Sequence, residues 1–263
     1  MNNELWIDPA LENRKITSFI KDVLKTNAFT NVVIGMSAGI DSTACFYLLK
    51  EVVPPENIFI AHLYQFVSYY DDIKNIVEDA RIPQENIYEM SIEPIVKSFQ
   101  SLSYFNNEAI EQSNNDKLRL GNIMARVRMI ILYDLAKKHN ALVCGTENKT
   151  ENLLGYFTRF GDQASDFEPI QHLYKTQVYA LAKSLGIPQN IIDKEPTAGL
   201  WHGQTDEGEF GFTYKEADQV LFYYVDKKLK VEEIKKMGFK NAEKIINFSL
   251  KNAYKHHAPY IIG

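Results

Sequence analysis

A run of small and polar residues, Gly35-Met36-Ser37-Ala38-Gly39-Ile40-Asp41-Ser42, stands between an apolar segment and a stretch of helical period. A turn in that position directs successive backbone N–H groups, and the positive end of the following helix, at one point where a phosphate can bind. Ser37 and Ser42 add hydroxyl donors, and Asp41 supplies a hard oxygen ligand of the kind that Mg²⁺ prefers. The run therefore predicts a phosphate-binding loop; an ordinary strand-to-helix turn with a serine cap is the alternative.

The order of residues in this loop, Ser-x-Gly-x-Asp-Ser, resembles the S-G-G-x-D-S loop of the ATP pyrophosphatases. Those enzymes bind the β- and γ-phosphates of ATP and cleave ATP to AMP and pyrophosphate. The lysine of the Walker pattern G-x-x-x-x-G-K-S/T is absent, which excludes a standard kinase-type loop. The resemblance implies that ATP is a co-substrate.

Ala38 stands where the resembling loop has its second glycine. If φ is positive at this position, the Cβ atom costs about 1–2 kcal/mol, and the methyl group could crowd the pyrophosphate. If φ is negative, alanine is harmless. Both alternatives are open at this point.

Several further motifs follow in order along the chain and resemble the NAD synthetase family. The resemblance covers most of the chain, and the number and spacing of its motifs make it highly specific. The matching text is GNIMARVR at 121–128, GTENKTE at 145–151, GYFTRFGD at 155–162, LYKTQV at 173–178 and PTAGLWHGQTDE at 196–207.

This resemblance implies a ligase that amidates deamido-NAD with ammonia, producing NAD, AMP and pyrophosphate through an NAD-adenylate intermediate. It also implies Mg²⁺ as the metal cofactor and a homodimer as the assembly. Two rival functions remain open. One is an ATP pyrophosphatase that acts on a different carboxylate, and the other is a weakly catalytic nucleotide-binding relative in which Ala38 has reduced turnover.

The resemblance assigns roles around the ATP phosphates. Asp41 and Glu151 would ligate Mg²⁺, and Lys175 would neutralise charge on the transferring phosphates, so these three residues form the expected catalytic group. Thr146 would contact ATP, and Thr197 would close over the nucleotide. The plainer alternatives are a solvated acid for Glu151, a helix cap for Thr146 and a solvated lysine at 175.

Further residues are expected to bind deamido-NAD. Arg128 lies two positions from Arg126 on one helix, so it faces elsewhere, and we expect it to form a structural ion pair. Arg159 stands where the family often has lysine, which keeps the charge and changes the hydrogen-bond geometry. The expected substrate-binding residues are Arg126, Arg159, Asp166, Tyr254 and Lys255.

The sequence offers no activated protein nucleophile: neither cysteine has a convincing histidine partner, and no Ser-His-Asp set is evident. The implied chemistry needs none, because the substrate carboxylate itself attacks ATP. Glutamine-dependent relatives carry an additional amidase domain, for which this chain has no room. Free ammonia, or ammonia from a separate partner protein, is therefore the expected nitrogen donor.

Short β-branched runs alternate with longer stretches of helical period, which predicts an α/β fold. We expect three layers, with a doubly wound parallel sheet and helices on both faces, in a single domain over 1–263. The family resemblance implies an adenine nucleotide alpha-hydrolase-like, Rossmann-like fold. Expected strands are 31–35, 58–64, 86–92 and 141–145, and expected helices include 16–24, 42–53, 71–81, 118–140, 176–185, 214–225 and 241–255.

Two long segments, 155–173 and 195–213, show no clear period. Loops of this length in a compact domain are usually functional or disordered. Both contain glycine, aromatic and charged residues, so we expect them to act as lids that protect the adenylate from water.

Composition limits the remaining function classes. The net charge of -5 argues against charge-driven binding to nucleic acid or to an anionic membrane. No signal peptide or membrane-spanning run is visible, and the sequence favours a cytoplasmic protein. Cys45 and Cys144 lie in apolar runs and are expected to be buried, unpaired thiols.

Overall fold

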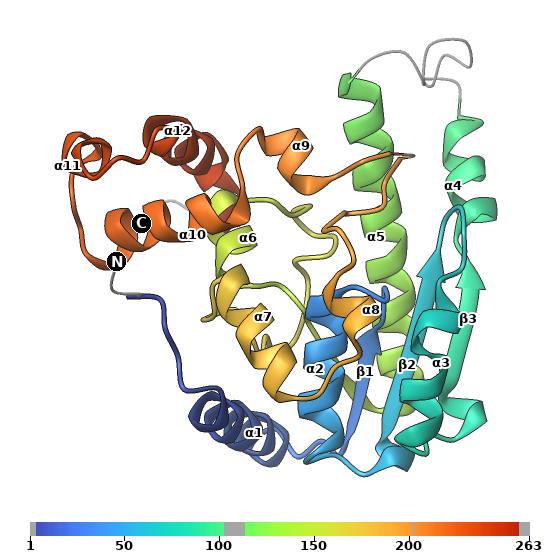
Figure 1. Ribbon diagram of the computed structural model, residues 1–263. Coiled ribbons are helices and arrows are strands. Elements are labelled where there is room, and N and C mark those ends of the chain that lie inside the picture. The colour runs from blue at the N-terminus through green and yellow to red at the C-terminus, as the bar shows by residue number, and fades with distance from the viewer. Residues whose placement is uncertain (1–3, 103–113, 202, 258–263) are drawn as a thin grey trace, which may run out of the picture.

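A four-stranded parallel sheet lies at the centre of the computed structural model, which describes residues 4–102, 114–201 and 203–257 (Figure 1). The order across the sheet is β3-β2-β1-β4, so β1 pairs with both β2 and β4. The predicted strands are confirmed with ends shifted by at most one residue. They are β1 (Asn31–Gly35), β2 (Ile58–Tyr64), β3 (Ile87–Ser91) and β4 (Ala141–Cys144).

The longer helices that apolar period predicts are all present, with ends shifted by up to seven residues, the largest shift being at the start of α1. They are α1 (Pro9–Thr26), α2 (Ile40–Lys50), α3 (Tyr70–Asp79), α5 (Asn114–His139), α7 (Lys175–Ser184), α10 (Tyr214–Leu221) and α12 (Ala242–Asn252).

The prediction omitted the shorter helices, because one or two turns contain too few residues to display a period. They are α4 (Glu93–Gln100), α6 (Lys149–Leu154), α8 (Gln189–Ile192), α9 (Asp206–Phe210) and α11 (Val231–Lys236).

Helices cover both faces of the sheet. Val32 and Ile34 of β1 point to one face, where α1, α2, α3 and α7 pack on them. Val33 points to the opposite face, against α4 and α5. Successive strand residues alternate between faces, so an apolar strand such as VVI becomes buried on both sides. The expected three-layer α/β fold is confirmed.

The order of strands reverses between β1 and β4. The chain adds β2 and β3 on one side of β1 and then returns to add β4 on the other side, so the carboxyl ends of β1 and β4 lie at this point. The helix after β1 lies on one face, whereas the helix before β4 lies on the other. In such sheets, the loops that leave the two strands separate and open a crevice for ligands. The phosphate loop follows β1, and the segment containing Glu151 follows β4.

A second apolar cluster joins α6, α9, α10, α11 and α12 beside the sheet, at the upper left of Figure 1. The buried carboxylate of Asp218 in α10 connects this cluster to the strand-bearing part. It accepts hydrogen bonds from the Thr150 hydroxyl at 2.6 Å and from the Thr176 amide at 2.7 Å. Thr150 in turn accepts from the backbone amide of Lys175 at 2.9 Å.

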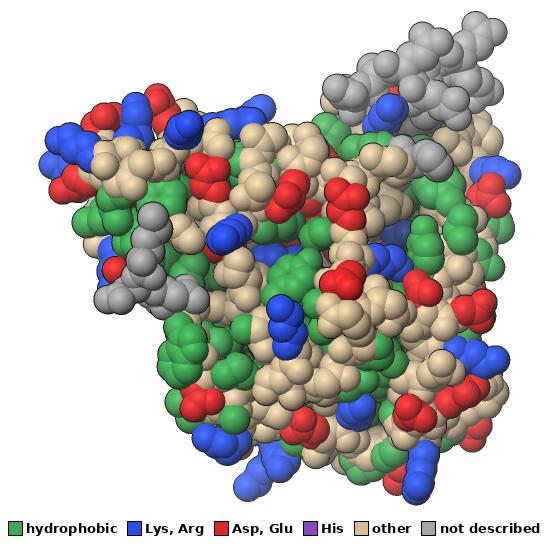
Figure 2. Space-filling view, viewed as in Figure 1, with side chains coloured by type: hydrophobic (Ala, Val, Ile, Leu, Met, Phe, Trp, Pro, Cys, Tyr) green, Lys and Arg blue, Asp and Glu red, His purple; other side chains and the backbone are tan. Residues whose placement is uncertain are grey.

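The surface intersperses acidic and basic side chains over the face shown in Figure 2, as the modest net charge suggests. Within the described ranges, no helix has the length and apolar character needed to cross a membrane. Cys45 and Cys144 are buried free thiols, as expected, and burial raises the pKa of Cys45 well above its usual value. A cytoplasmic location and the lack of nucleic-acid partners stay predictions.

Replacing Asp218 by alanine is expected to lower the free energy of unfolding by about 2–4 kcal/mol, because the buried Thr176 amide and Thr150 hydroxyl lose their acceptor. Urea unfolding followed by circular dichroism measures the change. Asp193→Ala, at an exposed site, is the control and is expected to stay within about 0.5 kcal/mol of the wild type. Equal effects of the two substitutions would contradict this role of Asp218.

Candidate active site

Three charged side chains meet in the crevice between β1 and β4. The ammonium of Lys175 lies 2.5 Å from Oδ2 of Asp41 and 3.0 Å from Oε1 of Glu151. The lysine side chain is only 3% exposed, so the ammonium exchanges water for these two carboxylates. The residues predicted as the catalytic group therefore form one cluster, although as many as 134 positions separate two of them.

The starts of three helices position this cluster. Asp41 is in the first turn of α2, Lys175 is the first residue of α7, and Glu151 is in the first turn of α6. Asn148 caps α6 by accepting from the Glu151 amide, while its Nδ2 donates to Asp41 Oδ1 at 3.0 Å. The positive ends of α2 and α6 thus stabilise the two carboxylates.

The electrostatics of the cluster favour the arrival of a cation. Burial raises the pKa of Glu151 to about 7; the Lys175 ammonium opposes this rise, and the carboxylates of Asp41 and Asp206 add to it. Burial alone would lower the pKa of Lys175, but Asp41 and Glu151 raise it above its usual value. Asp41, Glu151 and the neighbouring Asp206 thus act on a single ammonium, and a divalent cation would offset the repulsion among the carboxylates.

Asp41 and Glu151 are suited to share a divalent cation. Both carboxylates contact the ammonium of Lys175, so they lie close together. Two neighbouring carboxylates commonly bind Mg²⁺ together with phosphate oxygens and water. Among the described residues, no group of three histidine, cysteine or acidic side chains is arranged to hold a metal by itself. The donor set therefore fits a metal that arrives with a nucleotide better than a permanently bound one.

The phosphate loop folds back on itself through its serines. The Ser37 amide donates to Oγ of Ser42 at 3.3 Å, and the Gly39 amide donates to Oγ of Ser37 at 3.3 Å. Gly39 caps α2 without any side-chain hydrogen bond, so amide groups at the start of this helix remain open to a ligand. This geometry suits a phosphate at the start of α2.

Ala38 adopts the positive φ that the sequence left undecided. Its φ is 61°, in the left-handed region where a Cβ atom is strained by about 1–2 kcal/mol. The residue is completely buried and belongs to the apolar core packed around α1 and α2. The alanine therefore strains the loop, but its methyl group packs into the core instead of crowding the open face.

His62 supports the loop from the neighbouring strand β2, a role that the sequence analysis missed. The Tyr69 amide donates to Nε2 at 3.0 Å, so the ring proton lies on Nδ1 and is donated to the Met36 carbonyl at 2.7 Å. Burial lowers the pKa of His62, which favours this neutral form. The sequence signal was an imidazole within the otherwise apolar run Ile58–Leu63.

Buried carboxyl groups behind the crevice also escaped prediction. Burial raises the pKa of Glu147 to about 8, with contributions from Glu168 and Glu151. Burial likewise raises the pKa of Glu168 to about 7. Glu168 accepts from the Glu147 amide at 3.0 Å, and a Cβ atom at Gly145 would come within 1.8 Å of its Oε1. The glycine of the GTENKTE motif is therefore required for this close approach.

The residues predicted to bind deamido-NAD lie outside the Lys175 cluster. Arg126 on α5 donates to the Arg159 carbonyl at 3.1 Å, which brings these two side chains into one region. Asp166 lies at the edge of the sheet, where it accepts from the Val143 amide at 2.7 Å. Tyr254 is exposed at the end of the C-terminal helical segment.

Two other side chains of interest donate to backbone carbonyls, and the substrate contact expected of Lys255 stays a prediction. Lys255 donates to the carbonyls of Gly155 and Phe157, at 2.7 and 2.9 Å, and so fixes the start of the 155–173 segment. Among the described residues Arg128 has no ion pair within 4.0 Å; the buried carboxylate of Asp162 acts on it at longer range and opposes the fall in the pKa of Arg128 that burial causes. Its Nε donates to the Leu63 carbonyl at 2.9 Å, because the side chain enters the layer between α5 and β2.

The two predicted threonines lie in different segments of the chain. Thr146 is half-buried, two residues after β4 and close in sequence to Glu151. Thr197 is exposed, and its hydroxyl accepts from the Gly199 amide at 3.0 Å.

A phosphate loop at the reversal point of a parallel sheet, together with an acid–lysine cluster, defines a nucleotide-binding α/β enzyme. The NAD synthase family model matches residues 12–259. The NH(3)-dependent NAD(+) synthetase of Thermococcus kodakarensis is 46% identical over 83% of this chain and 82% of its own length. That of Fusobacterium nucleatum is 39% identical over 98% of both chains. The chain belongs to the NAD synthase family.

Solved structures agree with this assignment. The NH3-dependent NAD synthetase from Campylobacter jejuni has a TM-score of 0.77 at 30% identity, over 98% of this chain and 100% of that one. The NMN synthetase from Francisella tularensis has a TM-score of 0.80 at 30% identity, over 98% and 99% of the two chains. The predicted fold and family are confirmed, as is the expected class of enzyme, a ligase of ammonia-dependent NAD synthesis.

Ala38→Gly is expected to change kcat for NAD formation by less than about twofold, because the methyl group lies in the core. Its stability should stay within about 1 kcal/mol of the wild type, since relief of strain offsets the lost methyl contact. Steady-state kinetics and urea unfolding measure the two quantities. Ala44→Gly, equally buried but inside α2, has no strain to relieve and should lose about 1–2 kcal/mol. A tenfold gain in kcat for Ala38→Gly would instead support the weakly catalytic alternative.

Proposed function

We propose that this chain catalyses the ATP-dependent amidation of deamido-NAD by ammonia, with release of AMP and pyrophosphate. The observation that carries the proposal is the buried Asp41–Lys175–Glu151 cluster beside the phosphate loop, in a chain of the NAD synthase family. This arrangement can hold a polyphosphate and stabilise the negative charge that develops when it leaves.

In the first step, the pyridine carboxylate of deamido-NAD attacks the α-phosphorus of ATP, and pyrophosphate departs. The loop amides between Gly35 and Ser42 orient the β- and γ-phosphates, so that the leaving group points away from the carboxylate. Lys175 donates to phosphate oxygens as their charge grows. Asp41 and Glu151 would hold Mg²⁺, which when bound supplies positive charge to the leaving pyrophosphate.

In the second step, ammonia attacks the carbonyl carbon of the acyl-adenylate, and AMP leaves with the bonding electron pair. The nitrogen loses a proton as the amide forms. Since the mixed anhydride is already activated, no protein nucleophile is needed. The chain must instead hold the adenylate in place and exclude water, which would hydrolyse it.

Two anionic substrates that repel each other need separate cationic contacts. We assign the anionic groups of deamido-NAD to Arg126 and Arg159, and a hydrogen-bond contact with the same substrate to Asp166. The hydrogen bond from Arg126 to the Arg159 carbonyl, and a buried Nε of Arg159 without a partner among the described residues, support a polyanion-binding region there. Lys255 would act on this region by holding Gly155 and Phe157, and Tyr254 would lie at its border. Thr146 and Thr197 would contact the ATP nucleoside.

The proposal is tested by incubating the purified chain with ATP, Mg²⁺, ammonium and either deamido-NAD or nicotinate mononucleotide, with separation of the products. We expect NAD, AMP and pyrophosphate from deamido-NAD. Preferential amidation of nicotinate mononucleotide would show that this smaller acid is the substrate. Failure to form pyrophosphate with either acid would refute adenylylation.

Asp41→Asn and Glu151→Gln are each expected to lower kcat by about a hundredfold or more, with a smaller effect on the KM for ATP, because the carboxylates act mainly on charge in the transition state. Pyrophosphate release in single turnover measures the loss. Asp193→Asn, with an exposed carboxylate, is the control. Wild-type release by either active-site variant would exclude the assigned metal role.

We also propose a homodimer, built on the outer side of α4 and α5. Ile95, Phe99 and Ile130 expose apolar side chains on these two adjacent helices, and Ile130 is 56% exposed. A patch of this kind on a soluble chain commonly marks a protein interface.

Light scattering after size exclusion is expected to give twice the chain mass of 30.3 kDa. Ile130→Glu should shift the population to monomer, because a charge in an apolar interface stays desolvated without a partner. Leu250→Glu, at a similarly exposed position on α12, should leave the dimer intact. A monomeric wild type, or a dimer insensitive to Ile130→Glu, would exclude this interface.

A further inference from the structure

The carboxylate of Asp226 binds the side chains of Lys149 and Tyr174. The ammonium of Lys149 donates to both carboxylate oxygens, at 2.9 and 2.7 Å, and the Tyr174 hydroxyl donates to Oδ2 at 3.0 Å. The same ammonium lies 4.5 Å from the centre of the Tyr174 ring. Tyr174 is buried, and the side chains of Lys149 and Asp226 are 24% and 33% exposed, so water reaches this contact only in part.

Lys149 and Tyr174 stand at the starts of the two helices that carry part of the catalytic group. Lys149 is the first residue of α6 and shares its first turn with Glu151. Tyr174 is the N-cap of α7, directly before Lys175. The backbone amide of Lys149 also donates to the Leu173 carbonyl at 2.8 Å, so the two helix starts lie side by side. The separation of the Glu151 and Lys175 side chains therefore depends on how these starts are held together.

A π-helical turn directs Asp226 toward these residues. The helix α10 continues into this turn, Phe222–Asp226, in which the Lys227 amide donates to the Phe222 carbonyl at 3.0 Å. In a regular α-helix, Asp226 would point roughly 80° away from Asp218. A π-helical turn rotates less per residue, which brings the two carboxylates toward one face of the helix. Such turns are rare and occur frequently at functional sites.

The contacts of Asp226 parallel those of Asp218. Each carboxylate accepts hydrogen bonds from one residue at the start of α6 and from one at the start of α7. The donors are Thr150 and Thr176 for Asp218, and Lys149 and Tyr174 for Asp226. Asp218 is completely buried, whereas Asp226 is partly exposed. Because a partly exposed ion pair contributes little to stability, replacement of Asp226 should disturb the helix starts without unfolding the chain.

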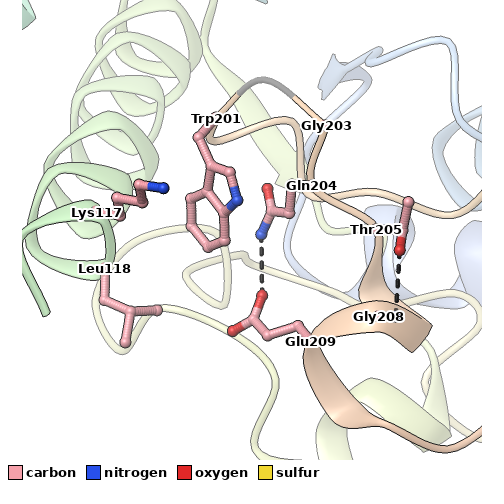
Figure 3. Close-up of a pocket in the computed structure, with 8 residues that line it drawn as sticks. All are labelled: Lys117, Leu118, Trp201, Gly203, Gln204, Thr205, Gly208 and Glu209. Atoms are coloured by element: carbon pink, nitrogen blue, oxygen red, sulfur yellow. Dashed lines mark hydrogen bonds between the residues drawn. The ribbon is translucent and has the colours of Figure 1, made fainter. Parts of the chain in front are cut away.

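The pocket between α5 and α9 lies outside this contact. It has a volume of about 410 Å³, and Figure 3 shows Lys117 and Glu209 among the side chains that line it. Its lining includes neither Asp226 nor the two residues that Asp226 binds. Substitutions of Asp226 therefore leave the side chains of this pocket unchanged.

We propose that Asp226 is a positioning residue for the release of pyrophosphate. Its carboxylate holds Lys149 and Tyr174, and through them it sets the starts of α6 and α7 at one separation. The neighbouring Glu151 and Lys175 then meet the ATP phosphates together. Displacement of a reacting group by about 1 Å can lower a rate a hundredfold. The inference rests on the proposed function, because it requires a reaction in which these two residues act on phosphate.

The test measures pyrophosphate release by Asp226→Asn in single turnover, with enzyme in excess over deamido-NAD and with saturating ATP and Mg²⁺. The amide keeps one acceptor oxygen for two donors, so the rate constant should fall about tenfold. This rate constant does not depend on the fraction of folded protein, so a loss of stability alone would leave it unchanged. In steady state, the KM for deamido-NAD should change less than about twofold. Asp226→Glu keeps the carboxylate and should remain within about threefold of the wild-type rate constant.

Glu216→Gln is the matched control on α10. Its carboxylate accepts two hydrogen bonds from Asn241, so it holds the start of α12 instead of α6 or α7. The control should keep the wild-type rate constant even if it unfolds at a lower urea concentration. If Asp226→Asn does not fold, Lys149→Met and Tyr174→Phe test the same contacts one at a time, each with an expected loss of about threefold.

A wild-type rate constant in folded Asp226→Asn, or in both single-contact variants, would overturn the positioning role while leaving amidation established. An equal loss in Glu216→Gln would overturn it as well. If the wild-type chain itself releases no pyrophosphate with deamido-NAD, the proposed function is refuted instead. The two failures are therefore distinguishable in one assay.

Discussion

The ion triplet of Lys175, Asp41 and Glu151 is the interaction on which the rest of the site depends. A buried ammonium needs partners, and here the partners come from the starts of two other helices. Because each group would be costly to bury alone, the triplet keeps the phosphate loop, the segment after β4 and the start of α7 in one arrangement. The same charges are the ones that a metal–phosphate ligand would meet.

Support for the triplet comes from both sides of the crevice. Asn148 connects Asp41 with the cap of α6. Asp218 accepts hydrogen bonds from Thr150 and Thr176, in the first turns of α6 and α7. On the outer side, Tyr214 reaches the Asp206 carboxylate. The helices packed beside the sheet are therefore part of the active site, since they position its charged groups through buried hydrogen bonds.

The sequence predicted some functional residues and missed others, and the difference depends on the kind of residue. The catalytic group was predictable because family motifs mark Asp41, Glu151 and Lys175 in a fixed order, and the structure brings them together. Asp206 was not singled out, although it lies within a recognised motif, because the donors to its buried carboxylate come from three separate segments. Lys255 was predicted to bind substrate, whereas its ammonium holds two carbonyls whose proximity no local pattern reveals.

The sequence by itself determined the local, short-range properties of the chain. Apolar runs and helical period defined the strands and longer helices, and the order of small residues after the first strand defined the phosphate loop. Tertiary structure alone decided the positive φ of Ala38, the redirection of Arg128 to a carbonyl and the hydrogen bonds of Asp206. The physical reason is that burial and hydrogen-bond partners depend on residues distant in the chain, which only the packed sheet and helices bring into contact.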